Sequence, residues 1–338
     1  MKVQPIYNNK IFKKGLEFAS DNGALFVATT SLVLSAIARP IAIMSTPKTD
    51  KENRKYATAK SLASSAVGYG LMLVTSLPLA KSIKKINKNP AKYLKDKTIK
   101  TLQAGEKSLD KSKKYKFATQ LFKLGLGFLI AVPKSIMTCA MIPTIVEKMF
   151  NSGKLKEENG KLNNFQLSTF NFQHDNNSPN FTGATDKLSK GIGKIIDTSF
   201  IKKLTEKFHN TNFEMHIMAL TDTLATGTFV AQTSKSKKID DDRKKALMYN
   251  AGISTGLSIL CGYTIDKLTK KPTEKFIKRF KEANKNSLKL DKYVEGIKIV
   301  KPAFILGSLY YIVIPLISTF LADRFDKNLY KSNSTLIK

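Results

Sequence analysis

The sequence predicts an all-α, polytopic helical membrane protein that consists of two tandem copies of a unit with three apolar helical segments. Three observations support this prediction: several long windows carry no charged residue, the charge of the chain is concentrated between these windows, and the two halves of the sequence resemble each other. The composition alone, with 42% hydrophobic residues, is that of an ordinary globular protein. The distribution of the apolar residues therefore carries the prediction.

The uncharged windows cover residues 22–38, 61–80, 246–265 and 302–322. A helix of about 20 apolar residues spans the hydrocarbon layer of a bilayer, which is about 30 Å thick, so the last three windows are long enough to cross. The window 302–322 has no polar face, which a buried helix of a soluble protein usually needs over such a length. We therefore expect an integral membrane protein; a soluble or peripheral helical protein is the alternative.

The second half of the chain repeats the pattern of the first half. Residues 11–85 align without a gap with residues 200–274, and 14 of these 75 pairs are identical. Self-similarity at a fixed offset is typical of a duplicated architecture. We therefore predict a first helical repeat over residues 1–150 and a second, shorter one over residues 200–327.

Each predicted repeat has three apolar segments in the same order, which we call a, b and c. They cover residues 24–44, 57–80 and 117–146 in the first repeat, and residues 213–234, 246–266 and 296–322 in the second. Pro143 and Pro315 occupy matching places in the two c segments, "MIPTIV" and "VIPLIS". Because proline removes a helical hydrogen bond, we predict a kink at each.

A charged turn separates segments a and b in both repeats, "STPKTDKENRKY" at residues 45–56 and "SKSKKIDDDRKK" at residues 234–245. In the first turn, Thr49 and Glu52 have the spacing of a capping box, which predicts that the next helix begins near Asp50. The run of three aspartates in the second turn places negative charge at the same helix N-terminus, where the helix dipole favours it. Both turns thus have a structural explanation.

Segment b is rich in small residues in both repeats. Gly68 and Gly70 lie in the first copy, and Gly252 and Gly256 form a GxxxG motif in the second. Small residues at this spacing allow helix backbones to approach closely in a bilayer. We therefore predict that these four glycines are helix-packing positions.

Between the repeats, residues 151–199 have neither periodicity nor sustained apolarity, and we predict a polar linker that is partly disordered. Its end resumes a helical pattern over residues 186–208, which we interpret as an interfacial amphipathic helix. Residues 328–338 are predicted to be a polar tail.

The net charge of +31 arises from 52 Lys and only 5 Arg, most of them between the apolar windows. A specific reader of nucleic acid usually shows arginines for base contacts and a recognisable motif, and neither is present. We therefore expect the Lys-rich linkers to face an anionic bilayer leaflet, and no specific nucleic acid. A protein partner is not identifiable from the sequence.

Positive-inside bias places the two b-to-c linkers, residues 81–114 and 266–301, in the cytoplasm. Three spans per repeat would put them on opposite faces, so we expect segment a to be re-entrant or buried against segment b. The residues before the first apolar window are mostly polar and no small-residue cleavage site stands out, so we expect no cleaved signal peptide. The expected location is the cytoplasmic membrane of a bacterium.

No motif identifies an enzyme. The histidines His174, His209 and His216 have no carboxylate cluster near them in sequence, and Cys139 and Cys261 lie within apolar windows. This pattern argues against a metal site, a disulfide framework and a nucleophilic triad. We assign no catalytic, cofactor-binding or metal-ligating residue and expect no cofactor.

Two charged residues lie within the segments a: Arg39 in the first repeat and Asp222 in the second. A charge inside a membrane is costly unless it is paired or faces a polar cavity, so both are candidate functional residues. The alternatives without a functional role are that the Arg39 side chain extends to the membrane interface and that segment 213–234 is not fully in lipid. We predict that the two residues lie within reach of each other if the repeats are inverted.

Two functions from different classes fit these observations. The first is a non-catalytic integral membrane protein that organises a bilayer region or binds a partner through its Lys-rich linkers. The alternative is a transporter or channel for a small solute, an ion or a lipid, because duplicated repeats are a recurring transporter plan. A polar cavity between the two copies would favour the second.

Overall fold

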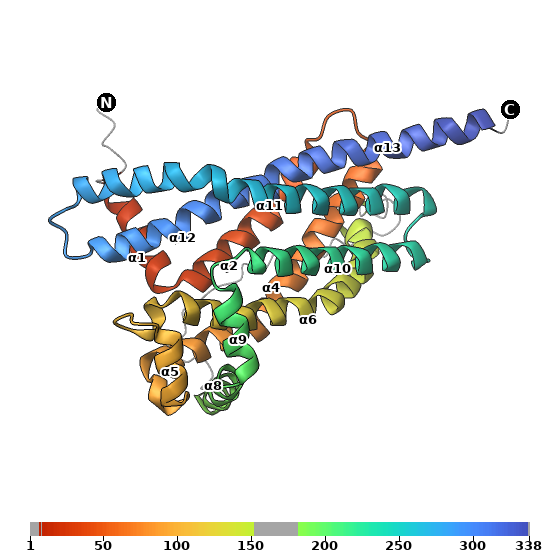
Figure 1. The fold of residues 1–338 in the computed structure, drawn as a ribbon. Helices are drawn as coiled ribbons and strands as arrows, with labels where there is room; N and C mark the ends of the chain where they lie inside the picture. Colours follow the sequence, from red (N-terminus) through yellow and green to blue (C-terminus); the bar gives the residue numbers. More distant parts are fainter. Residues whose placement is uncertain (1–6, 8, 152–181, 337–338) are drawn as a thin grey trace, which may run out of the picture. The chain divides into compact units, whose positions relative to one another are not determined.

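The computed structural model describes residue 7 and residues 9–151 and 182–336, and all regular secondary structure within these residues is helical (Figure 1). The predicted all-α fold class is therefore confirmed. Four stretches of the described chain are long and apolar enough to cross a membrane: Leu25–Met44, Lys51–Lys88, Lys113–Phe150 and Leu290–Lys327.

These four stretches contain segments a, b and c of the first half of the chain and segment c of the second half. Segment a of the first half thus qualifies by length and composition, although we expected it not to cross. Segment b of the second half, which we predicted to cross on its window 246–265, is not among the four. Its asparagine and its many serines, threonines and glycines make it less apolar than the other windows.

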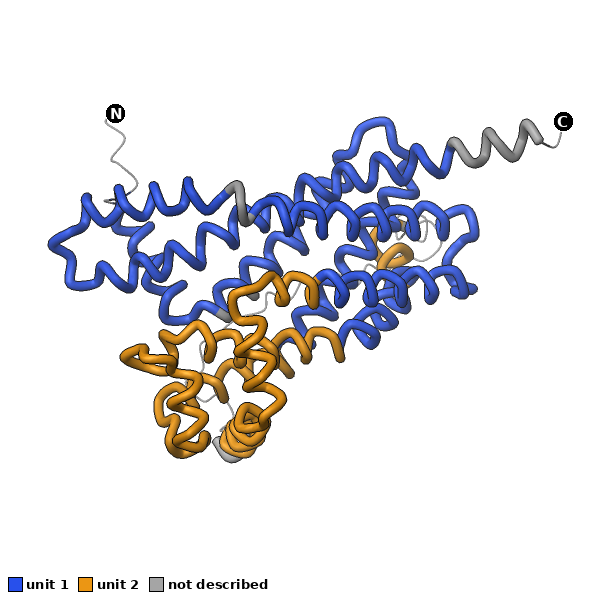
Figure 2. The backbone as a smooth tube through the Cα atoms, viewed as in Figure 1, with its two compact units in different colours: residues 1–72, 130–143, 219–338 blue, residues 73–129, 144–218 orange. Residues whose placement is uncertain are grey.

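The chain divides into two compact units (Figure 2). Unit 1 comprises residues 1–72, 130–143 and 219–338, and unit 2 comprises residues 73–129 and 144–218. Neither unit coincides with one of the predicted repeats, because each unit combines helices from both halves of the chain.

Unit 1 consists of long helices that contain all six predicted apolar segments in whole or in part. Its elements are α1 (Lys10–Asp21), α2 (Gly23–Val33), a π-helical turn (Leu34–Ala38), α3 (Arg39–Met44), the first part of α4 (Lys51–Lys88), the middle of α6 (Lys113–Ile145), most of α10 (Phe213–Lys235), α11 (Asp241–Ala283), α12 (Leu290–Ser308), a second π-helical turn (Leu309–Val313) and α13 (Ile314–Leu336). α11 has 43 residues and is about 65 Å long at 1.5 Å per residue. It therefore extends well beyond the uncharged window that predicted it.

The two helices that follow the charged turns begin where the sequence predicts. α4 begins at Lys51, but its cap is Asp50 rather than Thr49, because the Asp50 carboxylate accepts a hydrogen bond from the backbone N–H of Asn53 (3.0 Å). The hydroxyl of Thr49 instead donates to the carbonyl of Thr46 (2.7 Å). The expected capping box is thus replaced by an aspartate cap one residue later.

In unit 1, α1 packs against the C-terminal end of α11 and the beginning of α12. The buried cluster consists of Leu16, Phe280, Tyr293 and Ile297. Two ion pairs flank it, from Lys289 to Glu17 (3.1 Å) and from Lys292 to Asp21 (3.0 Å). These exposed pairs contribute little free energy, so the apolar cluster provides most of the stabilisation here.

Close backbone approach occurs at other glycines than those predicted. At Gly70, Gly252 and Gly256, no atom lies within 4 Å of the position that a Cβ would occupy, so none of them is a close-packing position. Their small side chains do not bring a neighbouring helix near. The close approach is instead at Gly296, where a Cβ would overlap the backbone carbonyl of Leu16.

Unit 2 contains the C-terminal part of α4, the N-terminal part of α6 and several shorter elements. These are two 3₁₀ turns (Pro90–Lys92 and Leu109–Lys111), α5 (Asp96–Gln103), a π-helical turn (Val146–Asn151), α8 (Thr182–Ile196) and α9 (Ser199–Phe208). Their buried core comprises Leu79, Ile83, Ile86, Leu94, Leu102, Leu109, Tyr115, Ala118, Ile192, Ile196 and Ile201. α8 and α9 thus contribute apolar side chains to a protein core.

The structure does not have one continuous helix over residues 186–208, where we predicted an interfacial amphipathic helix. Two helices replace it, since α8 ends at Ile196 and α9 begins at Ser199, where the Thr198 hydroxyl accepts a hydrogen bond from Ile201 N–H (3.4 Å). Protein rather than lipid covers the inner side of both helices.

Polar contacts also hold α8 in unit 2. The Tyr93 hydroxyl donates to Asp186 (2.7 Å), and this hydrogen bond, helped by the charge of Lys92, lowers the pKa of the Asp186 carboxyl. The Ser189 hydroxyl donates to the carbonyl of Ser82 on α4 (3.2 Å). Gly193 lies so close to the carbonyl of Tyr93 that an added Cβ would overlap it.

Two further predictions concern the ends of the repeats. The linker predicted over residues 151–199 lies largely outside the described residues, which resume at Thr182 with α8. α13 continues to Leu336 and so includes most of the predicted polar tail, residues 328–338.

Two pairs of neighbouring helices in unit 1 run antiparallel. α10 is antiparallel to α11, and α11 is antiparallel to α13. α6 and α10, however, run in the same direction, since the Ser135 hydroxyl donates to the Ala225 carbonyl (2.8 Å) and Cys139 Sγ lies 3.8 Å from Thr233 Oγ1. The chain must therefore return from the end of α6 to the beginning of α10.

This direction limits how the bundle meets a bilayer. Consecutive spans run in opposite directions when their connection stays on one face of the membrane. Residues 152–181 contain lysines, glutamates and many asparagines and have no apolar window of span length. α10 is also not among the four stretches of the described chain that are long and apolar enough to cross a membrane.

We expect the two Lys-rich linkers, residues 81–114 and 266–301, to be accessible from the same face of the membrane. Cysteines introduced as Lys97→Cys and Lys285→Cys, one at a time, replace exposed lysines; Cys139 and Cys261 would be changed to serine. An impermeant thiol reagent, applied to intact cells and to inverted vesicles, should label both from one face. Labelling of the two chains from opposite faces would contradict the expectation and would indicate inverted repeats.

Gly296→Ala should lower the free energy of unfolding by about 1–3 kcal/mol, because its Cβ would overlap a backbone carbonyl that cannot move independently. Gly256→Ala is the matched control: it has open space and should be neutral or stabilising by up to about 1 kcal/mol through helix propensity. Thermal unfolding of the purified proteins measures both. Equal midpoints for the two variants would contradict the close approach at Gly296.

Candidate ligand-binding cavity

Unit 1 contains a partly open cavity of about 230 Å³. Residues of α3, α4, α6, α10, α11 and α13 line it, and all of them belong to unit 1. The first three helices lie in the first half of the chain and the last three in the second half. Every one of the six predicted apolar segments therefore contributes to the same cavity.

The cavity wall is polar although the helices that form it are largely apolar. Its buried hydroxyl and amide side chains are Ser61, Ser135, Thr138, Asn250, Ser254, Ser318 and Thr319. Several of them join the helices: the Ser61 hydroxyl donates to the Ser35 carbonyl (3.1 Å), and the Asn250 amide donates to Thr319 Oγ1 (3.1 Å). Hydroxyl groups offer both donors and acceptors, so the wall can solvate a polar ligand.

Four ionisable side chains line the cavity: Arg39, Lys60, Lys134 and Asp222. None of them makes a hydrogen bond or an ion pair within the described part of the chain, and the Nε of Arg39 is buried without a partner. Lys60 Nζ lies 4.6 Å from the centroid of the Phe229 ring, which provides a cation–π contact.

The four charges interact electrostatically across the cavity. Asp222 attracts Lys134, whereas the positive charge of Arg39 repels both Lys60 and Lys134. Three cations and one carboxylate leave the cavity with a formal charge of 3 − 1 = +2. Like charges held close together in a partly desolvated site are unfavourable unless an opposite charge joins them.

Both charged residues singled out by the sequence therefore line one cavity, but they do not form the predicted pair. The electrostatic partner of Asp222 is Lys134, and no nitrogen of Arg39 lies within ion-pair distance of Asp222. Sequence reasoning missed Lys60 and Lys134. Lys60 stands directly before the uncharged window 61–80, and Lys134 lies in a segment with other lysines, so neither was conspicuous.

Lys134 also explains the one predicted glycine that has a close neighbour. A Cβ at Gly68 would lie 3.3 Å from Cε of Lys134, so the lysine side chain packs over α4 at this position. Gly68 thus leaves room for a charged side chain rather than for another helix backbone. The remaining predicted glycines are not in contact with the cavity lysines.

Prolines adjoin all three π-helical turns. Pro40 and Pro315 each stand two residues after such a turn, and Pro143 stands three residues before the turn Val146–Asn151. Proline cannot donate to the carbonyl four residues earlier and its ring clashes with it, and the wider π turn accommodates this. The matching prolines Pro143 and Pro315 therefore differ in local structure, since one precedes its turn and the other follows it.

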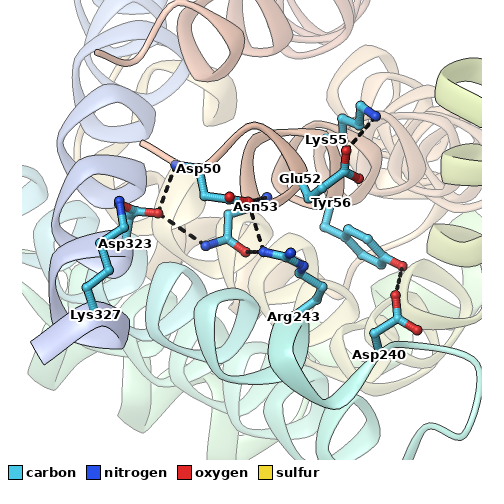
Figure 3. A network of polar contacts seen from close by, with 9 residues as sticks. All are labelled: Asp50, Glu52, Asn53, Lys55, Tyr56, Asp240, Arg243, Asp323 and Lys327. Carbon is cyan, nitrogen blue, oxygen red and sulfur yellow. Dashed lines mark hydrogen bonds and ion pairs between the residues drawn. The ribbon is translucent and has the colours of Figure 1, made fainter. Parts of the chain in front are cut away.

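A polar network joins the two charged turns at the N-termini of α4 and α11 (Figure 3). Arg243 donates to Asp50 Oδ1 (2.8 Å) and to Asn53 Oδ1 (2.9 Å). The Tyr56 hydroxyl donates to Asp240 (3.1 Å). The two turns, which are far apart in sequence, therefore bind each other directly.

The buried carboxylate of Asp323 on α13 completes this network. It accepts hydrogen bonds from the backbone N–H of Asp50 (3.0 Å) and the amide of Asn53 (3.2 Å), and it lies 2.6 Å from Lys327 Nζ. A carboxylate at a helix N-terminus is stabilised by the free N–H groups and by the helix dipole. Asp323 thus attaches α13 to the beginning of α4.

The network lies next to the cavity. A smaller pocket lined by Asn53 and Asp323 is also lined by Ala57, Asn250 and Thr319, and these last three residues line the main cavity as well. The network therefore borders the cavity at the end where α4 and α11 begin.

No family model matches the chain, and no curated protein or solved structure matches it. Among the residues that the structure describes, no group of three or more His, Cys, Asp or Glu side chains could hold a metal ion.

Asp323→Ala should lower the free energy of unfolding by about 1–3 kcal/mol, because it leaves the partly buried N–H of Asp50 and the buried amide of Asn53 without their acceptor. Asp241→Asn is the control, since that carboxylate is exposed and pairs only with Lys244; its effect should stay below about 0.5 kcal/mol. Thermal unfolding of both variants decides the matter. A destabilisation of the Asp323 variant no larger than that of the control would contradict the role of the network.

Proposed function

We propose that this protein is a non-catalytic membrane protein that binds a small polar or charged ligand in the cavity of unit 1. The observation that carries the proposal is the convergence of four ionisable side chains on one polar cavity among apolar helices, each without a hydrogen bond to the described part of the chain. Ionisable groups within membrane helices are costly and usually serve a ligand or a transport pathway. A purely structural bundle has no need of them.

Exposed apolar side chains support the contact with lipid. They lie on several helices of unit 1 and comprise Val27, Val33, Ile37, Ile41, Ile136, Met137, Met141, Leu220, Leu260, Phe304, Ile312, Val313 and Ile317. A soluble monomer rarely leaves so many large apolar residues in contact with water. The surrounding lysines, which give the chain its charge of +31, favour an anionic bilayer surface.

Equivalent packing in the two halves supports the proposed duplication of a three-segment unit. At the offset of 189 residues, α1 corresponds to α9, and Leu16 corresponds to Thr205. Both residues are fully buried, and each helix packs against the b-to-c linker of the other half: α1 in unit 1 and α9 in unit 2. If a three-segment unit is duplicated, equivalent helices of the two copies are expected to make equivalent contacts with the other copy, as α1 and α9 do.

The cavity also helps to distinguish the two functions expected from the sequence, which are membrane organisation or partner binding on the one hand and transport on the other. Organisation of a bilayer through Lys-rich linkers alone would leave the cavity charges without a role, so ligand binding is the better proposal. Transport of the ligand remains the alternative because both halves contribute to the cavity. The two charged turns bind each other, which favours parallel copies and weakens the inverted-repeat argument for a transporter.

Filling the cavity should abolish ligand binding without unfolding the protein. Ser258→Trp places a large side chain in the cavity, whereas Leu260→Trp, two residues away on α11, changes an exposed position and is the control. Purified protein would be tested by thermal unfolding against a panel of small anions, cations and neutral solutes. At least one solute should stabilise the native protein and the Leu260→Trp variant but not the Ser258→Trp variant. If no solute distinguishes the two variants, the proposed function is wrong.

A further inference from the structure

We propose that the ligand of the cavity is a terminal phosphate group, a tetrahedral anion with about two negative charges, supplied either as free inorganic phosphate or as the phosphate monoester of a lipid headgroup. This inference rests on the proposed function and adds the chemical class of the ligand. It follows from the charge of the cavity, from the hydrogen-bond donors in it and from the repulsion among its cations.

The charge of the cavity selects an anion. Arg39, Lys60 and Lys134 outnumber the single carboxylate, Asp222, and the formal charge of 3 − 1 = +2 would repel a cation. A monoanion would leave one positive charge uncompensated. One group that carries both negative charges can face all three cations at once, as a terminal phosphate group does.

The donors of the cavity match an oxyanion. The guanidinium group of Arg39 has a planar fork that binds phosphate or carboxylate through two hydrogen bonds, and its Nε is buried without a partner. The ammonium groups of Lys60 and Lys134 make no hydrogen bond within the described chain. Hydroxyl groups of Ser64 and other lining residues supply further donors.

The cations are arranged at a cost that an anion would remove. Arg39 repels Lys60 and Lys134, and the attraction between Lys134 and Asp222 and the cation–π contact of Lys60 with Phe229 offset only part of this repulsion. A bound dianion converts these repulsions into attractions to one shared partner. Its binding should therefore stabilise the folded protein in proportion to the logarithm of its concentration.

The test measures thermal unfolding of the purified full chain in detergent, with inorganic phosphate and with short-chain phosphatidic acid as the two probes. Potassium chloride at equal ionic strength and phosphatidylcholine are the matched controls. Stabilisation by inorganic phosphate supports binding of free phosphate, and stabilisation by phosphatidic acid alone supports a lipid source. Either result supports the proposed ligand class.

Variants then assign binding to the cavity. Lys60→Met should weaken the apparent affinity at least about tenfold, Lys60→Arg should keep most of it, and Asp222→Asn should strengthen it through the loss of a repelling charge. Lys97→Met removes an exposed lysine and should change nothing. If Lys60→Met fails to fold, Lys134→Met makes the same test.

Three outcomes would overturn the inference. Equal losses in Lys60→Met and Lys97→Met would mean that phosphate binds the Lys-rich surface. In the second outcome, a cationic, neutral or carboxylate solute stabilises the native protein but not Ser258→Trp, while phosphate does not stabilise either. That result would refute the ligand class and leave the proposed function intact. If no solute of any class distinguishes native protein from Ser258→Trp, the proposed function and this inference fail together.

Discussion

The arrangement of unit 1 depends on one buried carboxylate at the beginning of a helix. Asp323 on α13 accepts the backbone N–H of Asp50 and the amide of Asn53, while Arg243 on α11 bonds Asp50 and Asn53 from the other side. Free N–H groups at a helix N-terminus need acceptors, and a buried carboxylate needs donors, so each satisfies the other. Three helices from distant parts of the chain are thereby fixed at one point, next to which the cavity lies.

The cavity shows a different balance of charge. In the network, acids and bases are matched with short hydrogen bonds, whereas the three basic and one acidic side chains of the cavity make no such bonds to the residues that the structure describes. Groups that serve only stability are usually paired, because an unpaired buried charge costs several kcal/mol. This difference within one unit is the reason for proposing that the cavity binds a ligand.

Helix direction is the constraint that separates this bundle from an ordinary set of membrane spans. Hydropathy is calculated for each helix separately, and four stretches of the described chain are long and apolar enough to cross a membrane. α6 and α10 pack side by side in the same direction. Two parallel helices can both cross a membrane only if the chain between them crosses as well, and the sequence of residues 152–181 has no apolar window of span length. The length and apolarity of a helix therefore permit it to cross a membrane, whereas the connections between helices determine which neighbouring helices can cross together.

The sequence by itself determined the helical class, the six apolar segments and the charged turns, because these follow from local periodicity, charge and capping. It also indicated Arg39 and Asp222, since charges stand out in apolar segments. Only the tertiary structure decided their partners. Arg54 and Arg243 occupy identical places in the alignment, yet Arg54 donates to the Met44 carbonyl at the end of α3 and Arg243 joins the network. The physical reason is that such contacts link residues about 10 or about 190 positions apart, and no local pattern encodes which of them will meet.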